Sequence, residues 1–182
     1  QIARLKGCRV IGIAGSDDKC AFVKQVLGAD DCINRRADHF EALLAEACPE
    51  GVDIYFENVG GAVFQAVLPL LNPSSRISLC GLISQYGHDD AASNHARWQR
   101  AGADIFSQRS VTVHGLFVGN FVNDYQARFL EEMGAWVASG QVVYREDRWQ
   151  RLEKAPEAFA AMLKGDNFGK TMVQVGEDPT VN

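Results

Sequence analysis

The stretch Asp53–Tyr86, DIYFENVGGAVFQAVLPLLNPSSRISLCGLISQY, carries the pattern of a complete strand, helix and strand. The strand-like runs Val52–Phe56 and Arg76–Cys80 each end at polar or glycine residues. Between them, apolar residues recur at helical spacing, at Val63, Phe64, Val67, Leu68 and Leu71. A helical crossover makes the two strands parallel, and open parallel sheets bind ligands beyond the carboxyl ends of their strands. We therefore expect binding residues at Asn58 and in Cys80–Tyr86.

The chain on either side of this unit repeats the alternation of strand and helix. Further strands are predicted at Cys8–Ala14, Cys32–Ile33 and Val111–Val118, with helices from Ser16 to Leu27 and after a capping box of Asp38 and Glu41. This rhythm predicts an α/β fold with a doubly wound parallel sheet of Rossmann type. The polar segment Gly87–Arg109, with only a weak helical pattern, has the length of a mobile lid or surface loop.

The glycine-rich phosphate loop that normally follows the first strand of such a sheet does not occur in these 182 residues. In the strand order 3-2-1-4-5-6, Cys8–Ala14 corresponds to strand 2 and Val52–Phe56 to strand 4, so strand 1 belongs between them. Without strand 1, strands 2 and 4 would be separated by two strand spacings, about 9.6 Å, and the backbone groups facing this gap would be unpaired. We expect the 182 residues to be part of a longer polypeptide, or the gap to close or to recruit a neighbouring strand.

Composition narrows the class of function. The formal charge is -5 and Arg35-Arg36 is the longest basic run, which argues against nucleic acid as a partner. Apolar runs stay well below the roughly 18 residues of a membrane span, and no signal-peptide pattern is seen, so we expect a cytoplasmic protein without a membrane partner. The five cysteines form no CxxC pair and the four histidines are scattered, so we expect no metal site.

Few residues have an obvious chemical role. Ser16 and Lys19, after a predicted strand, suit a phosphate, although Ser16 could equally be only a helix cap and Lys19 only a solvated side chain. Tyr86 could donate a proton in catalysis or simply pack against the sheet. Cys80 is interpreted as a buried strand-end residue, since no histidine is placed to activate it. Alternation puts Asp53 and Glu57 on one face of a strand, without a partner that would make them catalytic.

The motifs GIAGSDDK, DIYFENVGG, LCGLISQY, YRED and LKGDNFGK together resemble the zinc-independent medium-chain dehydrogenase/reductases of the prostaglandin reductase, leukotriene B4 12-hydroxydehydrogenase and curcumin reductase group. The similarity extends over about Gln1–Val175. It implies an enzyme of the 2-alkenone reductase type, which uses NADPH (cofactor NADP) to reduce the activated C=C bond of α,β-unsaturated ketones or aldehydes.

The same resemblance assigns roles to individual residues. Lys19 would bind the NADP phosphate, beside Ser16, and Asn58 would lie against the cofactor. Residues along the nicotinamide and its ribose would be Cys80, Gly81, Ile83, Ser84 and Tyr86, followed by Leu116, Phe117 and Val118. Asn167 would reach the cofactor from the C-terminal part, and Tyr86 would be the catalytic candidate. Arg35 stands where the family has a tyrosine and could stack or pair with phosphate.

The resemblance also predicts how the chain is divided. Residues 1–122 would form an incomplete dinucleotide-binding domain, and residues 123–182 a C-terminal α+β segment of a GroES-like substrate domain, with a homodimer formed through the former. In that C-terminal part we expect a helix over Asp124–Ser139, a strand over Val142–Tyr144, a helix from Pro156, a strand over Thr171–Val175 and a disordered tail after Gly176.

Two alternatives stay open. The chain could be a truncated, non-catalytic dinucleotide-binding or dimerising fragment of such an enzyme. A methyltransferase on a similar sheet is the weaker alternative, since no motif of that class is visible. Ligand binding would separate these hypotheses. Binding of NADPH supports the reductase, binding of no nucleotide supports the fragment, and binding of S-adenosylmethionine supports the methyltransferase.

Overall fold

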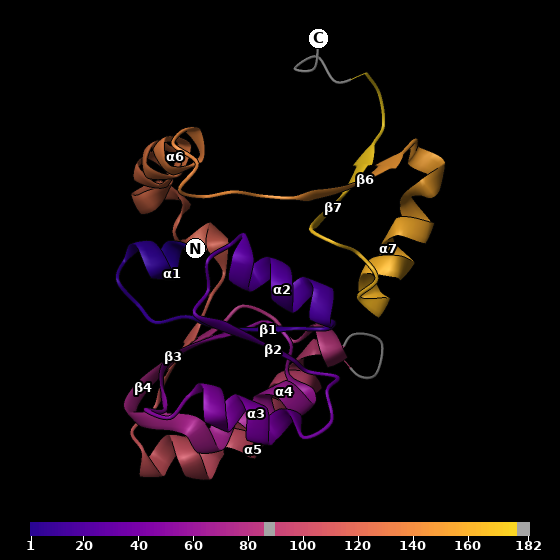
Figure 1. The fold of residues 1–182 in the computed structure, drawn as a ribbon. Coiled ribbons are helices and arrows are strands. Elements are labelled where there is room, and N and C mark those ends of the chain that lie inside the picture. Colours follow the sequence, from indigo (N-terminus) through magenta and orange to yellow (C-terminus); the bar gives the residue numbers. More distant parts are fainter. Residues whose placement is uncertain (86–89, 178–182) are drawn as a thin grey trace.

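The computed structural model describes residues 1–85 and 90–177 of the chain. After the short helix α1 (Ile2–Leu5), strands and helices alternate as far as β5 (Figure 1). These elements are β1 (Ile11–Ala14), α2 (Asp17–Gln25), β2 (Asp31–Asn34), α3 (Phe40–Ala47), β3 (Val52–Glu57), α4 (Gly61–Val67), β4 (Leu71–Leu79), α5 (Ala91–Gln108) and β5 (Thr112–Gly115). Single 3-10 turns at Leu68–Leu70 and Ile83–Gln85 connect some of them.

All strand pairs in this part are parallel. β1 pairs with β2, and a second sheet has the order β3-β4-β5. Helix α2 lies on one side of the strands, and α3, α4 and α5 lie on the other (Figure 1). Helices on both sides of parallel strands confirm the predicted doubly wound fold of Rossmann type.

The predicted interruption of the sheet is present. In the part of the chain that the structure describes, no ladder joins β1 to β3, so strands 3-2 and strands 4-5-6 of the usual order form separate sheets. On β3, Ile54 and Phe56 are 53% and 58% exposed although both are large and apolar. β3 therefore has an unpaired edge on the side of β1. It also has an exposed apolar face, which Ile54 and Phe56 form.

The β1–α2 unit shows how local sequence fixes the local structure. Ser16 caps α2 as predicted, because its side chain accepts a hydrogen bond from the backbone nitrogen of Lys19 at 3.4 Å. Gly12 allows α2 to approach the strand closely: a Cβ added there would stand only 2.9 Å from Cγ1 of Val23 and 3.0 Å from Sγ of Cys32.

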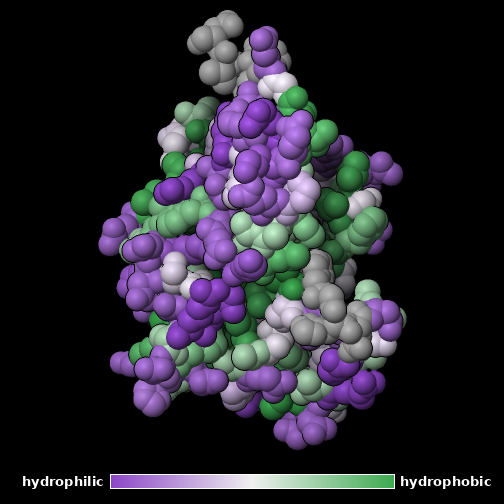
Figure 2. All heavy atoms as spheres, turned by 90° about the vertical axis from the view of Figure 1, so that its right-hand side faces the viewer, coloured by the Kyte–Doolittle hydropathy of each residue, from purple (hydrophilic) through white to green (hydrophobic). Residues whose placement is uncertain are grey.

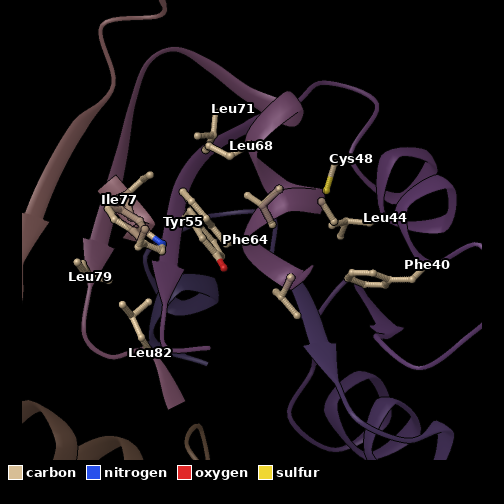
Figure 3. Packing of buried hydrophobic residues seen from close by; sticks show 14 residues of the cluster. Phe40, Leu44, Cys48, Tyr55, Phe64, Leu68, Leu71, Ile77, Leu79 and Leu82 are labelled. Carbon is tan, nitrogen blue, oxygen red and sulfur yellow. The ribbon is translucent and has the colours of Figure 1, made fainter. Parts of the chain in front are cut away.

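The hydrophobic core lies between β3–β4 and the helices beside them (Figure 3). Leu71 and Ile77 of β4 are fully buried, and Phe64 of α4 is 2% exposed. Trp98 of α5, also 2% exposed, stacks on Phe64 with ring centroids 4.5 Å apart. Helix α5 is thus a structural part of the core.

This packing corrects the prediction for Gly87–Arg109. Residues Ala91–Gln108 form a regular helix, capped by Asp90, whose carboxylate accepts from the backbone nitrogens of Ala92 and Ser93. The buried residues of the helix are Asn94, Trp98 and Gly102. A lid or surface loop was therefore the wrong expectation for this segment.

Several smaller expectations are also wrong. Helix α3 begins after His39, which has a left-handed backbone and makes no side-chain cap bond, so the Asp38–Glu41 capping box does not form. Val142–Tyr144 is not a strand; the strand follows it at Glu146–Gln150. Val118 lies in a 3-10 turn (Val118–Asn120) because β5 already ends at Gly115.

Of the C-terminal elements, α6 lies at the upper left of Figure 1, and β6, α7 and β7 lie together at the upper right. Helix α6 (Val122–Ala138) is followed by an extended segment, β6 (Glu146–Gln150), the turn Leu152–Lys154, α7 (Ala155–Lys164) and β7 (Lys170–Gln174), with β6 and β7 parallel. The group meets α2 through Phe22 and Phe168, whose rings lie edge to face at 5.3 Å, with Arg145 over Phe168 at 4.0 Å.

Figure 2 shows the molecule from the side of α7. Apolar side chains are exposed near the middle of this face, below a region of hydrophilic side chains. None of the helices in the described residues combines the length and apolar character that crossing a bilayer requires. The tail predicted to be disordered begins after Gly176, and all of it except Glu177 lies outside the described residues.

Candidate functional site

The carboxyl ends of β3 and β4 lead into two loops that are joined by hydrogen bonds. The carbonyl of Glu57 accepts from the backbone nitrogens of Cys80 at 2.9 Å and Gly81 at 3.2 Å. The carbonyl of Asn58 accepts from the nitrogen of Ile83 at 3.2 Å, and that of Val59 from the nitrogen and Oγ of Ser84 at 3.0 and 2.5 Å. The structure thus brings together the predicted residues Asn58, Cys80, Gly81, Ile83 and Ser84 at one end of the sheet.

The turn between β3 and α4 has a backbone that favours glycine. Gly60 has φ 75° and ψ -159°, and Gly61 has φ 57°. A Cβ on Gly60 would stand 3.1 Å from Leu82 Cδ2 and 3.4 Å from Ser84 Oγ. Gly60 therefore permits both the turn and the close approach of the second loop.

Glu57, the last residue of β3, is completely buried beneath these loops. Its Oε1 accepts from the backbone nitrogens of Val59 at 2.7 Å and Gly60 at 2.9 Å, and its Oε2 from Nε1 of Trp98 at 3.2 Å. Burial, and then the Glu57 carboxylate, raise the pKa of Tyr55 on the same face. The carboxylate is thus paired with donors from two segments of the core.

A cavity of about 620 Å³ opens beside the loops. Its lining is mainly apolar and comes from the ends of β4 and β5 and the start of α5: Leu79, Cys80, Gly81, Leu82, Ala91, Asn94, His95, Gly115, Leu116 and Phe117. Cys80 is exposed rather than buried as predicted, because β4 ends at Leu79 and the chain turns outward there. A mostly apolar cavity with a few polar groups at strand ends suits a small organic ligand.

A second group of predicted residues lies where β1 and β2 end. Lys19 Nζ donates to the carbonyl of Gly165 at 2.5 Å, and Arg36 donates to that of Lys164 at 3.1 Å. A guanidinium nitrogen of Arg35 lies 3.7 Å from where a Cβ of Gly15 would stand, and another lies 4.0 Å from that of Gly165. Three cations thus gather at the carboxyl end of β1 and β2, facing the C-terminus of α7.

The remaining predicted residues belong to neither the joined loops after β3 and β4 nor the group of cations at the ends of β1 and β2. Asn167 follows α7, and its Nδ2 donates to the carbonyl of Gly169 at 2.8 Å. Leu116 and Phe117 line the cavity, whereas Val118, 73% exposed, does not. Tyr86, the catalytic candidate, lies outside the described residues.

Sequence reasoning missed three features of this end of the molecule. His95 and Asn94 line the cavity because α5 is a helix, and Arg36 joins Arg35 beside α7. Glu57 was recognised as a strand residue, but not as a buried anchor. The sequence signal for Glu57 was its place at the end of an apolar strand directly before a glycine turn.

A profile of the zinc-binding dehydrogenase family matches residues 1–136. The zinc in that description finds no site among residues 1–85 and 90–177, where no three histidine, cysteine, aspartate or glutamate side chains gather so as to hold a metal ion. The residues described do not fit the metal, and we route no chemical step through it.

Similar proteins match along nearly the whole chain. An NADPH-dependent curcumin reductase of Escherichia coli is 44% identical over 178 residues, which cover 98% of this chain and 51% of that protein. Prostaglandin reductase 1 of Mus musculus is 38% identical over 175 residues, covering 96% of this chain and 51% of the mouse protein. The chain therefore spans about half the length of the curated relatives it matches.

Solved structures agree with these relatives. A structure of CurA from Vibrio vulnificus in complex with NADPH has a TM-score of 0.81 at 45% identity, and it matches 97% of this chain and 52% of the CurA chain. A second CurA structure from that organism has a TM-score of 0.83 at 46% identity, with the same coverage.

Proposed function

Because this chain belongs to the zinc-binding dehydrogenase family, we propose that it is the cofactor-binding part of an NADPH-dependent oxidoreductase. The observation that carries the proposal is the likeness, over 97% of the chain, to a protein solved in complex with NADPH. The two groups of residues at the strand ends support it, since one supplies cations for a phosphate and the other an apolar cavity for a planar ring.

The phosphate of NADPH would bind at the carboxyl end of β1. Lys19 Nζ, Ser16 and the guanidinium groups of Arg35 and Arg36 are the groups proposed to hold it. The carbonyl of Gly165 now accepts the Lys19 hydrogen bond, so the phosphate would have to replace it. No acidic side chain that would favour NAD stands at the tip of β1, where Ala14 is followed by Gly15 and Ser16.

The nicotinamide would lie in the cavity, next to Asn58 and the loops that follow β3 and β4. Cys80, Gly81, Ile83 and Ser84 would contact the nicotinamide and its ribose, and Leu116 and Phe117 would line the far wall of the cavity. Val118 would contact the cofactor from outside the cavity lining, and Asn167 would approach from the C-terminal part. NADPH supplies the hydride when bound. The chain's own residues would orient its ring, exclude water through the apolar lining and, at Tyr86, offer a proton donor for the substrate oxygen.

For the reaction we propose reduction of the activated C=C bond of α,β-unsaturated ketones or aldehydes. The β-carbon would gain the hydride, leaving NADP⁺, and Tyr86 would protonate the substrate oxygen. The resulting enol would tautomerise to the saturated ketone or aldehyde, so that the α-carbon carries the added proton, and Tyr86 would regain a proton from water. The relatives include a curcumin reductase and prostaglandin reductases, whose names are consistent with such substrates. We retain the division into residues 1–122 and 123–182 and the homodimer as proposals, and the cytoplasmic location stays a prediction from the sequence.

One observation favours a second candidate. The open edge of β3 and the exposed Ile54 and Phe56 beside it are features of an incomplete sheet. They support a non-catalytic dinucleotide-binding or dimerising fragment, in which an apolar face drives association. This candidate predicts self-association without turnover.

Titration of the chain with NADPH and with NADH, followed by tryptophan quenching, tests the proposal. We expect tighter binding of NADPH, and a loss of roughly tenfold or more in its affinity in Lys19→Ala with NADH affinity unchanged, because a charge-assisted bond to phosphate disappears. Lys24→Ala is the matched control, since Lys24 lies on the same helix but pairs with Asp31. Equal binding of both nucleotides would contradict the phosphate site, and no binding of either would favour the second candidate in its form of a dimerising fragment.

A further inference from the structure

We propose that Glu57 is a positioning residue that locks the cofactor-side turn at Asn58–Gly60 to helix α5 through Trp98. The identity of the cofactor in this proposal rests on the proposed function. The link that Glu57 makes between the turn and α5 does not depend on it. Glu57 touches neither the cavity nor the expected cofactor atoms. It would act by fixing the segments that do.

The side chain of Glu57 is surrounded by hydrogen-bond donors. Glu57 is fully buried in a cluster that contains Tyr55, Phe64 and Trp98. The hydrogen bonds to its oxygens from Val59, Gly60 and Trp98 all come from N–H groups, which can only donate. A carboxylate that only accepts bonds meets these donors without offering a competing proton. The site therefore supplies hydrogen-bond donors to both carboxyl oxygens of Glu57.

On one side the carboxylate shapes the turn. Oε1 accepts from the backbone nitrogens of Val59 and Gly60, at 2.7 and 2.9 Å, so the chain folds back onto the carboxylate directly after Asn58. The carbonyls of Asn58 and Val59 then hold the second loop through Ile83 and Ser84. Asn58, an exposed residue expected to lie against the cofactor, is presented by this arrangement.

On the other side the carboxylate fixes α5. Oε2 accepts from the indole N–H of Trp98, whose ring packs against Phe64 and Phe106 at centroid distances of 4.5 and 5.5 Å. One turn earlier on the same helix, Asn94 and His95 line the cavity. The cavity wall and the cofactor-side turn are thus joined through one side chain, and displacement of either would strain the other.

Stability alone does not test this role, since replacing a buried charge can be neutral for folding. Glu57→Gln keeps the size of the side chain but turns an amide NH₂ toward an N–H donor. Asp53→Asn is the matched control, because Asp53 is an exposed carboxylate on the same strand that accepts from Asn72. Trp98→Phe keeps an aromatic ring in the core, removes the N–H that reaches Glu57 and leaves a smaller side chain at a buried position.

The experiment measures hydrogen exchange of individual amides by NMR, together with the NADPH dissociation constant, for these variants. In Glu57→Gln we expect exchange at Val59 and Gly60 to rise at least tenfold while Ile77, in the centre of β4, exchanges as before. The NADPH dissociation constant should rise about tenfold as well. Asp53→Asn should change neither, and adding Trp98→Phe to Glu57→Gln should have less effect than Trp98→Phe alone.

Two results would overturn the proposal. Exchange that rises equally at Ile77 would mean that Glu57 only supports global stability, and unchanged exchange at Val59 and Gly60 would mean that the carboxylate does not hold the turn. If the exchange pattern appears as expected but the wild-type chain binds no NADPH, the anchoring role stands and the proposed function fails.

Discussion

Replacing Trp98 by alanine tests whether α5 is part of the core or a surface segment. Trp98 is 2% exposed, stacks on Phe64 at 4.5 Å and lies 5.5 Å from Phe106. Truncating a buried tryptophan costs about 3–5 kcal/mol, and a lost aromatic pair about 0.5–1.5 kcal/mol more. The indole N–H also leaves Glu57 Oε2 without this donor. We expect a loss of about 5 kcal/mol in the free energy of unfolding.

Urea unfolding followed by circular dichroism measures this loss. For a chain of this length, about 5 kcal/mol corresponds to a fall of roughly 10–20 °C in the melting temperature. Since whole domains are stable by about 5–15 kcal/mol, Trp98→Ala can leave the chain largely unfolded. Trp98→Phe then provides a graded version, with an expected loss of about 1–3 kcal/mol for the missing hydrogen bond and a further cost for the smaller buried ring.

Arg100→Ala is the control, because Arg100 is exposed on the same helix. A surface change of this kind shifts stability by no more than about 0.5 kcal/mol. If Trp98→Ala behaved like Arg100→Ala, the segment would be a surface loop after all, and the reasoning about α5 and Glu57 would fall with it.

Three further expectations follow from the local geometry. Gly60→Ala should lower the free energy of unfolding by about 2 kcal/mol, because a backbone with φ 75° and ψ -159° suits only glycine. Gly134→Ala is the control and should not lower it, since a Cβ on this residue of α6 would meet open space. Equal effects of the two substitutions would refute the strained turn. The hydrogen bond from the Ser93 side chain holds the pKa of Asp90 below its ordinary 3.8, so its stabilising contribution is present above about pH 4 and lost as the pH falls through the lowered pKa. Unfolding measured between about pH 5 and 3 should accordingly vary less with pH in Asp90→Asn, and an unchanged slope would argue against this cap. A thiol reagent near neutral pH should label the exposed Cys8 and Cys80 first, since burial raises the pKa of Cys32 to about 12; early labelling of Cys32, detected by mass spectrometry, would contradict its burial.

Much of the fold could be predicted because its signals are local. The strands around α4 stand out as apolar runs that end at polar or glycine residues, and Ser16 is a cap of ordinary type. Helix α5 could not be recognised, because its buried stripe runs through Asn94, Trp98 and Gly102, two of which are not apolar. Gly102 is nevertheless required there, since a Cβ would stand 2.3 Å from the ring of Phe106.

The same distinction applies to the site. The loops after β3 and β4 could be anticipated from parallel topology, which brings the carboxyl ends of neighbouring strands to one edge. The role of Glu57 depends on Trp98, 41 residues away, and so leaves no local pattern. Likewise Lys19 meets the end of α7 through Gly165, 146 residues away in the sequence, a contact that no spacing rule contains.

A structure of the chain with NADPH bound would show whether the two strand-end groups bind one NADPH molecule. The account predicts the 2′-phosphate within about 3.2 Å of Lys19 Nζ, in place of the Gly165 carbonyl. It also predicts the nicotinamide ring against Cys80 and Leu116, in the cavity at the ends of β4 and β5. A phosphate bound away from Lys19, or a nicotinamide outside that cavity, would contradict it.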